Sequence, residues 1–167
     1  MQITGRILIL MATTIMGIYI GNIPLNRKKD LLQLKKAINI LSSEIERQTQ
    51  LKIAMKNISQ FVNFPFNEIF KNFVSLIGEE SPKEAFERSM KKYEKKTYIN
   101  KEDIEIVNNC FSVIGSVDNE AQKNALSHLG FQLDIAINEC SEIAIKHKKM
   151  YVSLGVSFGL LINVLIF

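Results

Sequence analysis

Two long segments without any charged side chain, one near each end, restrict how this chain of 167 residues can fold. They are residues 7–26 and 150–167. At 1.5 Å of rise per residue, each would form a helix of about 27 to 30 Å, close to the hydrocarbon thickness of a bilayer. All 17 acidic residues and every basic residue except Arg6 lie between them. Both segments are therefore expected to lie in the lipid bilayer.

This pattern predicts three parts: an N-terminal transmembrane anchor over 1–26, a water-soluble domain over 27–149 and a C-terminal transmembrane helix over 150–167. A secretory signal peptide is the other interpretation of the N-terminus, because Arg6 precedes an apolar run. The bulky side chain of Tyr19 stands where a cleavage site would need small residues, which favours an uncleaved anchor.

Basic residues sit on the inner side of both segments. They cluster at 27–29, directly after the first, and at 146–149, directly before the second, whereas only Arg6 precedes the first. Because cytoplasmic flanks of membrane helices are rich in lysine and arginine, we expect a cytoplasmic middle domain with both termini across the membrane.

Each uncharged segment contains a pair of glycines four residues apart: Gly17 with Gly21, and Gly155 with Gly159. On a helix, such a pair leaves a patch without side chains where another helix can approach closely. The pairs could join the two segments of one chain or different protomers. Glycine is also frequent enough in membrane helices for the spacing to arise by chance.

The middle of the chain has helical periodicity and lacks the period-two alternation of a half-buried strand. Helices are expected from about Asp30 to Gln48, from a cap at Thr49, over 66–77, from a cap at Ser81, from a cap at Asn100, and from about Asn119 to near Phe167. The predicted fold is all-α, an antiparallel bundle of about six helices with a transmembrane helix at each end of the chain.

The sequence contains no strong catalytic signature: no phosphate-binding glycine loop, no His-Glu-x-x-His and no Gly-x-Ser-x-Gly. His128 and His147 would stand about 29 Å apart on the last helix, too far to share a metal ion. Cys110 and Cys140 are expected to be buried and reduced. A formal net charge of +4 is too small to predict a nucleic-acid partner. We expect no enzyme, cofactor or metal site, and a protein that acts through contacts.

Several runs, in order along the chain, resemble the stage III sporulation protein AB family of endospore-forming bacteria. They are Ala12-Thr13-Thr14 with Gly17, Ala85-Phe86-Glu87, Gly115-x-x-Asp118-x-x-x-Gln122, and Leu154-Gly155. Phe86 stands where the family has tryptophan, and Gln50 where it has proline. Gly115, Asp118 and Gln122 are interpreted as residues that specify the fold, through a helix end and the start of the next helix.

The resemblance implies a non-enzymatic subunit of the channel between mother cell and forespore, in the mother-cell membrane facing the forespore. The family is similar to the inner-membrane platform proteins of type II secretion and type IV pilus machines. The implied partners are the secretion-type ATPase of the same operon, other stage III sporulation channel subunits and further copies of the chain.

Exposed charges at Lys35, Glu44 and Arg47 on the first cytoplasmic helix are the candidate docking residues for this ATPase. The alternative function is a membrane-tethered adaptor or regulator that binds an unrelated cytoplasmic partner.

Overall fold

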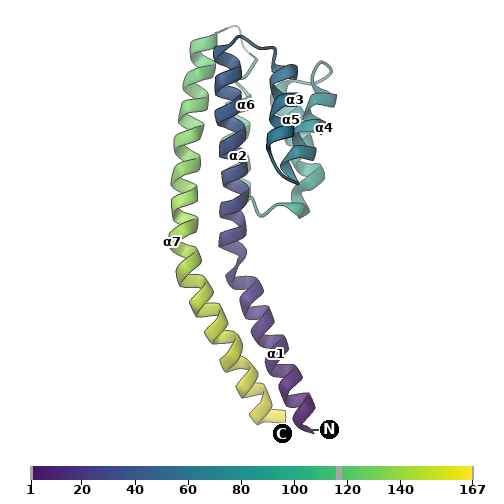
Figure 1. Ribbon diagram of the computed structural model, residues 1–167, viewed down its shortest axis with the longest axis vertical. Coiled ribbons are helices and arrows are strands. Elements are labelled where there is room, and N and C mark those ends of the chain that lie inside the picture. The colour runs from purple at the N-terminus through teal and green to yellow at the C-terminus, as the bar shows by residue number, and fades with distance from the viewer. Residues whose placement is uncertain (1, 116–117, 167) are drawn as a thin grey trace. The chain divides into compact units, whose positions relative to one another are not determined.

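The computed structural model describes residues 2–115 and 118–166, and their regular structure is helical apart from one isolated bridge between Ile77 and Glu80 (Figure 1). The elements are α1 (Gln2–Gly21), α2 (Ile23–Glu46), α3 (Leu51–Phe61), α4 (Phe66–Leu76), α5 (Pro82–Tyr93), the 3₁₀ helix η1 (Glu94–Lys96), α6 (Lys101–Phe111) and α7 (Asn119–Ile166). The predicted all-α class is confirmed.

The chain divides into two compact units. The terminal unit contains residues 1–26 and 138–167, and the central unit contains residues 27–137. Helix α7 supplies residues to both, because it continues without a break over 48 residues. Its extent agrees with the single long helix predicted from Asn119.

The core of the central unit is built from the apolar faces that the periodicity predicts. Phe111 of α6 lies at its middle, with its ring centroid 4.5 Å from that of Phe86 on α5 and 5.4 Å from that of Phe73 on α4. All three rings are buried, as are Phe66 and Phe70. Burial of each such ring stabilises the fold by about 1.5 to 3 kcal/mol, and stacked or tilted aromatic pairs add to this.

Local capping boxes start two of the helices at the predicted residues. The Ser81 side chain accepts from the Glu84 backbone N–H, and the Glu84 carboxylate accepts from the Ser81 N–H, which forms a capping box with Pro82 at the first helical position. Asn100 and Asp103 form a second box at the start of α6. These reciprocal bonds satisfy backbone donors that a helix start otherwise leaves without partners.

Two predicted helix boundaries are wrong. Thr49 does not cap α3: Gln50 holds that position without a side-chain bond to the backbone, and the Thr49 side chain bonds to the Glu44 carboxylate instead. Helix α2 begins at Ile23 rather than near Asp30, because the helices are interrupted only around Asn22. The uncharged residues before 27 are compatible with helix, so nothing local prevents α2 from starting earlier.

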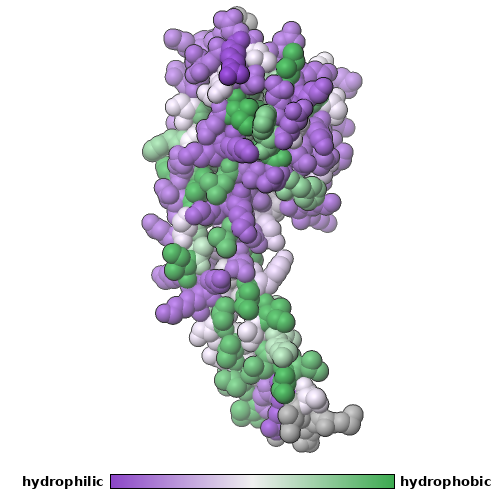
Figure 2. Space-filling view, in the orientation of Figure 1, coloured by the Kyte–Doolittle hydropathy of each residue, from purple (hydrophilic) through white to green (hydrophobic). Residues whose placement is uncertain are grey.

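The terminal unit has an apolar surface. Within the described residues, two helical stretches are long and apolar enough to cross a membrane, one near each end of the chain. Figure 2 shows hydrophobic residues gathered over α1 and the C-terminal part of α7, while hydrophilic residues dominate the surface of the central unit. Large apolar side chains such as Leu8, Met16 and Leu161 are exposed there, as expected of residues that face lipid.

Candidate functional site

The predicted glycines lie where α1 and the C-terminal part of α7 meet inside the terminal unit. A Cβ added to Gly17 would lie 2.5 Å from the backbone oxygen of Tyr151, and one added to Gly155 would lie 2.7 Å from the backbone oxygen of Thr13. The Cα of Gly155 is only 3.4 Å from the Gly17 Cβ position. Any side chain at either position would push the helices apart. The glycines thus face each other within one chain, one of the arrangements that the sequence leaves open.

The second glycine of each pair extends the same close contact. A Cβ on Gly21 would lie 3.0 Å from the Cα of Lys148, and one on Gly159 would lie 3.3 Å from the Cα of Leu10 and would clash with the hydroxyl of Thr13. The Thr13 hydroxyl donates to backbone oxygens of its own helix, 3.1 Å away. We call this contact between α1 and α7, from Gly21 to Leu10 and from Lys148 to Gly159, the glycine seam.

Asn163 continues the seam with a polar contact. Its side-chain amide donates to the backbone oxygen of Arg6 on α1 at 3.2 Å and to that of Gly159 at 2.9 Å. Its amide oxygen is buried and has no hydrogen-bond partner in the described part of the chain. Together with Lys148 opposite Gly21, this contact defines an antiparallel register for the two helices. Side-chain hydrogen bonds of this kind hold membrane helices in one register.

In the central unit, the beginning of α2 is bonded to the beginning of α6 by a buried ion pair. The Arg27 guanidinium donates from Nε and Nη2 to the two carboxylate oxygens of Asp103, at 2.8 and 2.7 Å. The Asp103 side chain is 2% exposed and that of Arg27 is 20% exposed. Asp103 also accepts the backbone N–H of Asn100 at 3.1 Å. The fork geometry and the additional bond offset the cost of burying the carboxylate.

A second contact binds the same two segments. The backbone N–H of Tyr98 donates to the Asp30 carboxylate at 2.7 Å. Burial raises the pKa of Asp30 above its ordinary value, and the bond from Tyr98 lowers it in part. We call Arg27, Asp30, Tyr98 and Asp103 the α2–α6 clasp. The clasp joins the beginning of the central unit, which directly follows the first candidate membrane helix in sequence, to residues about 70 positions later.

The run Gly115-x-x-Asp118-x-x-x-Gln122 forms the connection between α6 and α7. Gly115 has φ of +90°, a conformation that favours glycine. Asp118 accepts the backbone N–H groups of Glu120 and Ala121 at 2.9 and 3.1 Å, which caps α7. The buried Gln122 side chain accepts the Gly115 N–H at 3.2 Å. These contacts are structural, and residues 116 and 117 lie outside the described part.

The three candidate docking residues differ in what they contact. Lys35 forms an ion pair with Asp134 of α7. The Glu44 carboxylate accepts from Asn57 of α3 at 3.2 Å, and its bonds to the Thr49 and Asn57 side chains lower its pKa. Arg47 is exposed in the turn that follows α2. Two of the three charges are thus used in contacts within the chain.

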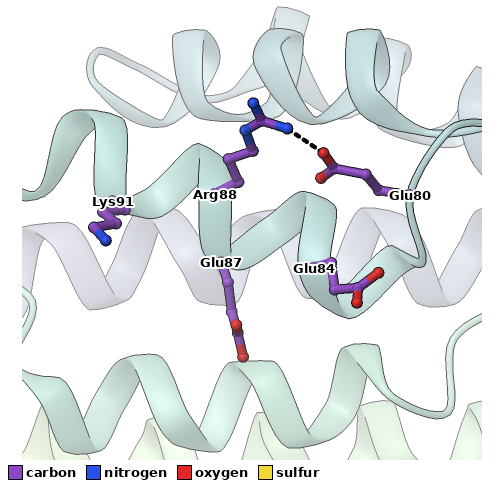
Figure 3. A pocket seen from close by; sticks show the side chains of 5 residues that line it. All are labelled: Glu80, Glu84, Glu87, Arg88 and Lys91. Atoms are coloured by element: carbon purple, nitrogen blue, oxygen red, sulfur yellow. Dashed lines mark hydrogen bonds and ion pairs between the residues drawn. The ribbon is translucent and has the colours of Figure 1, made fainter.

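An open pocket on α5 gathers charged side chains but does not resemble a catalytic site. Glu80, Glu84, Glu87, Arg88 and Lys91 line it. Figure 3 shows their side chains pointing in different directions, with Arg88 turned to its ion-pair partner Glu80. Bonds from the Ser81 hydroxyl and backbone lower the pKa of Glu84, so it is ionised at neutral pH and is no general acid.

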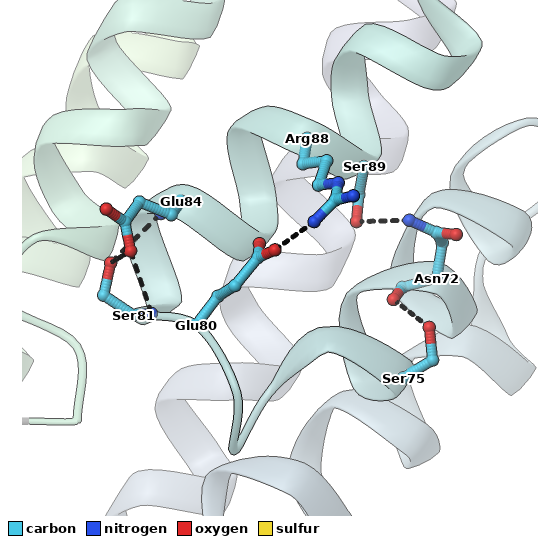
Figure 4. A network of polar contacts seen from close by, with 7 residues as sticks. All are labelled: Asn72, Ser75, Glu80, Ser81, Glu84, Arg88 and Ser89. Carbon is cyan, nitrogen blue, oxygen red and sulfur yellow. Dashed lines mark hydrogen bonds and ion pairs between the residues drawn. The ribbon is translucent and has the colours of Figure 1, made fainter.

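Next to this pocket, polar side chains join α4 to α5. The Asn72 amide donates to the buried Ser89 hydroxyl at 3.0 Å, and Lys92 donates to the Asn72 side-chain oxygen, also at 3.0 Å. Figure 4 shows the contact between Asn72 and Ser89 together with the Ser81 and Glu84 capping box. The network supplies the hydrogen bond that Ser89 needs in its buried position.

Neither cysteine is placed for chemistry. Cys110 and Cys140 are buried and are not joined in a disulfide, and burial raises the pKa of Cys110 to about 12. A thiol with so high a pKa is a poor nucleophile at neutral pH. Among the described residues, no group of three or more His, Cys, Asp or Glu side chains could hold a metal ion.

Sequence reasoning missed the α2–α6 clasp. Arg27 and Asp103 are 76 positions apart, and no local pattern links them. A usable signal exists only for Asp103, which stands three residues after the capping Asn100 and so occupies the acidic position of a capping box.

The geometry defines a class of protein: an all-α chain with a charged helical body and two candidate membrane helices packed together through glycines. The family model of stage III sporulation protein AB matches residues 2–167. The chain belongs to this family.

A curated relative and a solved structure are similar to the chain. The chain is 27% identical to stage III sporulation protein AB of Bacillus subtilis (strain 168) over 169 residues, covering 99% of both chains. A solved structure of stage III sporulation protein AB (SpoIIIAB) matches with a TM-score of 0.66 at 22% identity, covering 71% of this chain and 96% of the other. The second match concerns the fold alone.

Proposed function

We propose that the chain is a non-enzymatic platform subunit of the channel between mother cell and forespore, and that its central unit docks a secretion-type ATPase. The observation that carries this proposal is the division of a sporulation-family chain into a charged helical body and a glycine-packed pair of apolar helices. A body of this kind offers protein contacts, and the apolar pair offers attachment to a bilayer.

Helix α7 supports a role in passing motion between the units. It contributes its first part to the central unit and its remainder to the terminal unit, over 48 residues without a break. The sequence has no phosphate-binding glycine loop of its own, so the energy must come from a partner. We propose that the ATPase encoded in the same operon supplies it.

The proposed location is the mother-cell membrane facing the forespore, with the central unit in the cytoplasm and both termini on the opposite side. The basic residues at 27–29 and 146–149 support this orientation. In this setting the other partners are further stage III sporulation channel subunits and additional copies of the chain.

Co-purification tests the docking. The full-length protein, extracted in mild detergent, is expected to retain the ATPase of its operon, while an unrelated membrane protein of similar size does not. Absence of the ATPase from the purified complex, and of any crosslink between the two in cells, would refute the docking role. Deletion of the gene is expected to block sporulation after engulfment. Normal spores would instead favour an adaptor with an unrelated partner.

A further inference from the structure

We infer that the ATPase docks on a basic and aromatic surface formed by α3 and the loop that follows it, and that the segment it places there is acidic and carries apolar side chains. We call this surface the α3 face. It consists of the exposed residues Ile53, Lys56 and Phe61 of α3 and Phe64 of the loop, together with Lys36, which is bound to the Phe61 backbone, and Lys96, which lies near the Phe64 ring. The inference rests on the proposed function and specifies where the partner binds.

The apolar side chains of the α3 face are exposed, whereas aromatic side chains of the adjoining helix α4 are buried. Ile53, Phe61 and Phe64 are 50%, 57% and 59% exposed. By contrast, Phe66 and Phe70, which follow directly in α4, are buried in the core. One exposed apolar residue requires no explanation, but two aromatic rings and an isoleucine on one helix and its loop indicate an interaction surface.

Contacts within the chain hold the backbone that carries the aromatic residues, and one of them touches the Phe64 ring. Lys36 of α2 donates from Nζ to the backbone oxygen of Phe61. The side-chain oxygen of Gln33, one turn earlier, accepts the backbone N–H of Asn63 at 2.9 Å. Lys96 of η1 places its ammonium group 5.4 Å from the ring centroid of Phe64. Because the loop is already tied to α2 and η1, binding costs little conformational entropy, as at the anchor residues of protein interfaces.

The charge of the α3 face indicates the chemistry of its partner. Lys36, Lys56 and Lys96 are exposed, and none of them forms an ion pair with a carboxylate in the described chain. Elsewhere in the central unit, by contrast, Lys35 and Arg88 are paired with Asp134 and Glu80. A surface of unpaired lysines around aromatic rings is complementary to carboxylates that flank apolar side chains.

A second copy of the chain is a weaker occupant. Phe131 and Ile135 form another exposed apolar pair in the central unit. The carboxylate beside them, Asp134, is bound to Lys35, so it is not available to the lysines of the α3 face. In the open pocket on α5, the Glu80 carboxylate is already bound to Arg88.

The test measures binding of the purified ATPase to the full-length protein in nanodiscs. Two variants remove the α3 face: Phe61→Ala with Phe64→Ala, and Lys56→Glu with Lys96→Glu. The matched controls change exposed residues of the same types on α7, as Phe131→Ala with Ile135→Ala, and Lys123→Glu. Because all these side chains are exposed, every variant should melt at the wild-type temperature.

Each α3-face variant is expected to bind the ATPase at least about tenfold more weakly, while the controls bind like wild type. If the wild type binds and the α3-face variants bind equally well, this inference is wrong and the proposed function stands. If the wild type does not bind the ATPase at all, both are wrong.

The bilayer composition separates protein docking from lipid binding. Nanodiscs of zwitterionic phosphatidylcholine and of anionic phosphatidylglycerol should give the same loss of ATPase binding in the variants. A loss seen only in phosphatidylglycerol would show that the lysines contact lipid headgroups, and the assignment of the α3 face to the ATPase would be withdrawn.

Discussion

Asp103 shows how a single carboxylate can join distant parts of the chain. It accepts two bonds from the Arg27 guanidinium and one from the Asn100 backbone, and its side chain is almost fully buried. Removal of one member of such a pair leaves the other charge unpaired and partly shielded from water. This lowers the free energy of unfolding more than the loss of a solvent-exposed ion pair does. The clasp is therefore the polar contact in the central unit on which stability should depend most.

Substitution of Asp103→Asn is expected to lower the free energy of unfolding by about 3 kcal/mol. The asparagine can still accept the Asn100 N–H, so the loss reports the charge pair. The control is Asp134→Asn, which removes the ion pair with Lys35 at a position where the carboxylate is 48% exposed and should cost less than about 1 kcal/mol. Urea unfolding of the full-length protein in detergent, followed by circular dichroism, measures both. Equal losses would contradict a special role for the clasp.

Two carboxyl groups in the central unit should give opposite pH dependence. Burial raises the pKa of Asp30, so the folded state holds the proton of this carboxyl group more tightly than the unfolded chain does. The contribution of Asp30 to stability therefore falls as the pH rises from its unfolded-state pKa through its folded-state pKa. Hydrogen bonds from Ser81 lower the pKa of Glu84, so its contribution is present at neutral pH and is lost as the pH falls through its folded-state pKa.

Asp30→Asn keeps an acceptor for the Tyr98 N–H. We expect the unfolding free energy of this variant, relative to that of wild type, to be higher at pH 7 than at pH 4. Glu84→Gln should be less stable than wild type at pH 7 and approach it at pH 4. Unfolding free energies at the two pH values test both signs. A difference between variant and wild type that does not change with pH would contradict the corresponding shift.

At the scale of elements, the glycine seam determines how α1 and α7 approach each other. Three of its four glycines leave no room for a Cβ without movement of a backbone or a side chain from the facing helix. The polar contact between Asn163 and the Arg6 backbone lies at the far end of the same pair. In lipid there is no hydrophobic driving force between helices, so close backbone packing and such hydrogen bonds must provide the association.

Gly155→Leu is therefore expected to separate α1 from α7. The measurement is disulfide formation between cysteines introduced at Met16 and Leu154, which line the same groove beside the seam. The protein with the two introduced cysteines and Gly155 unchanged should form the disulfide within one chain efficiently. Gly155→Leu should lower the yield of this disulfide at least about fivefold. Gly130→Leu is the control, because a Cβ at Gly130 of the same helix meets nothing within 4 Å. Crosslinks that join two chains instead of one would contradict the intramolecular seam.

At the scale of the whole molecule, the proposed role requires that the two units work in different surroundings. The terminal unit has an apolar surface and the central unit a charged one, and the chain between 27 and 149 contains all the acidic residues. The expectation that the terminal unit lies in lipid rests on its uncharged segments, and the cytoplasmic location of the central unit rests on the basic residues beside them.

Reporter fusions should place both ends of the chain on the side of the membrane opposite the central unit. Alkaline phosphatase fused before Met1 or after Phe167 is expected to be active, and the same enzyme inserted after Gly78, an exposed turn position, is expected to be inactive. A cytoplasmic signal from either terminus would contradict the proposed orientation, because a pair of spanning helices must place its two ends on one side.

The amino-acid sequence by itself determined the features that depend on local chemistry. The charge-free ends, the apolar periodicity of the helices, and the caps at Ser81, Asn100 and Asp118 are all legible within a few residues, because helix formation and capping involve neighbours three or four positions apart. Only the tertiary structure decided which glycines meet, that Arg27 binds Asp103, and that Lys35 is occupied by Asp134 while the α3 face stays exposed. These contacts and the bond from Asn163 to the Arg6 backbone join residues up to 157 positions apart. They depend on how the helices pack, which no short stretch of sequence encodes.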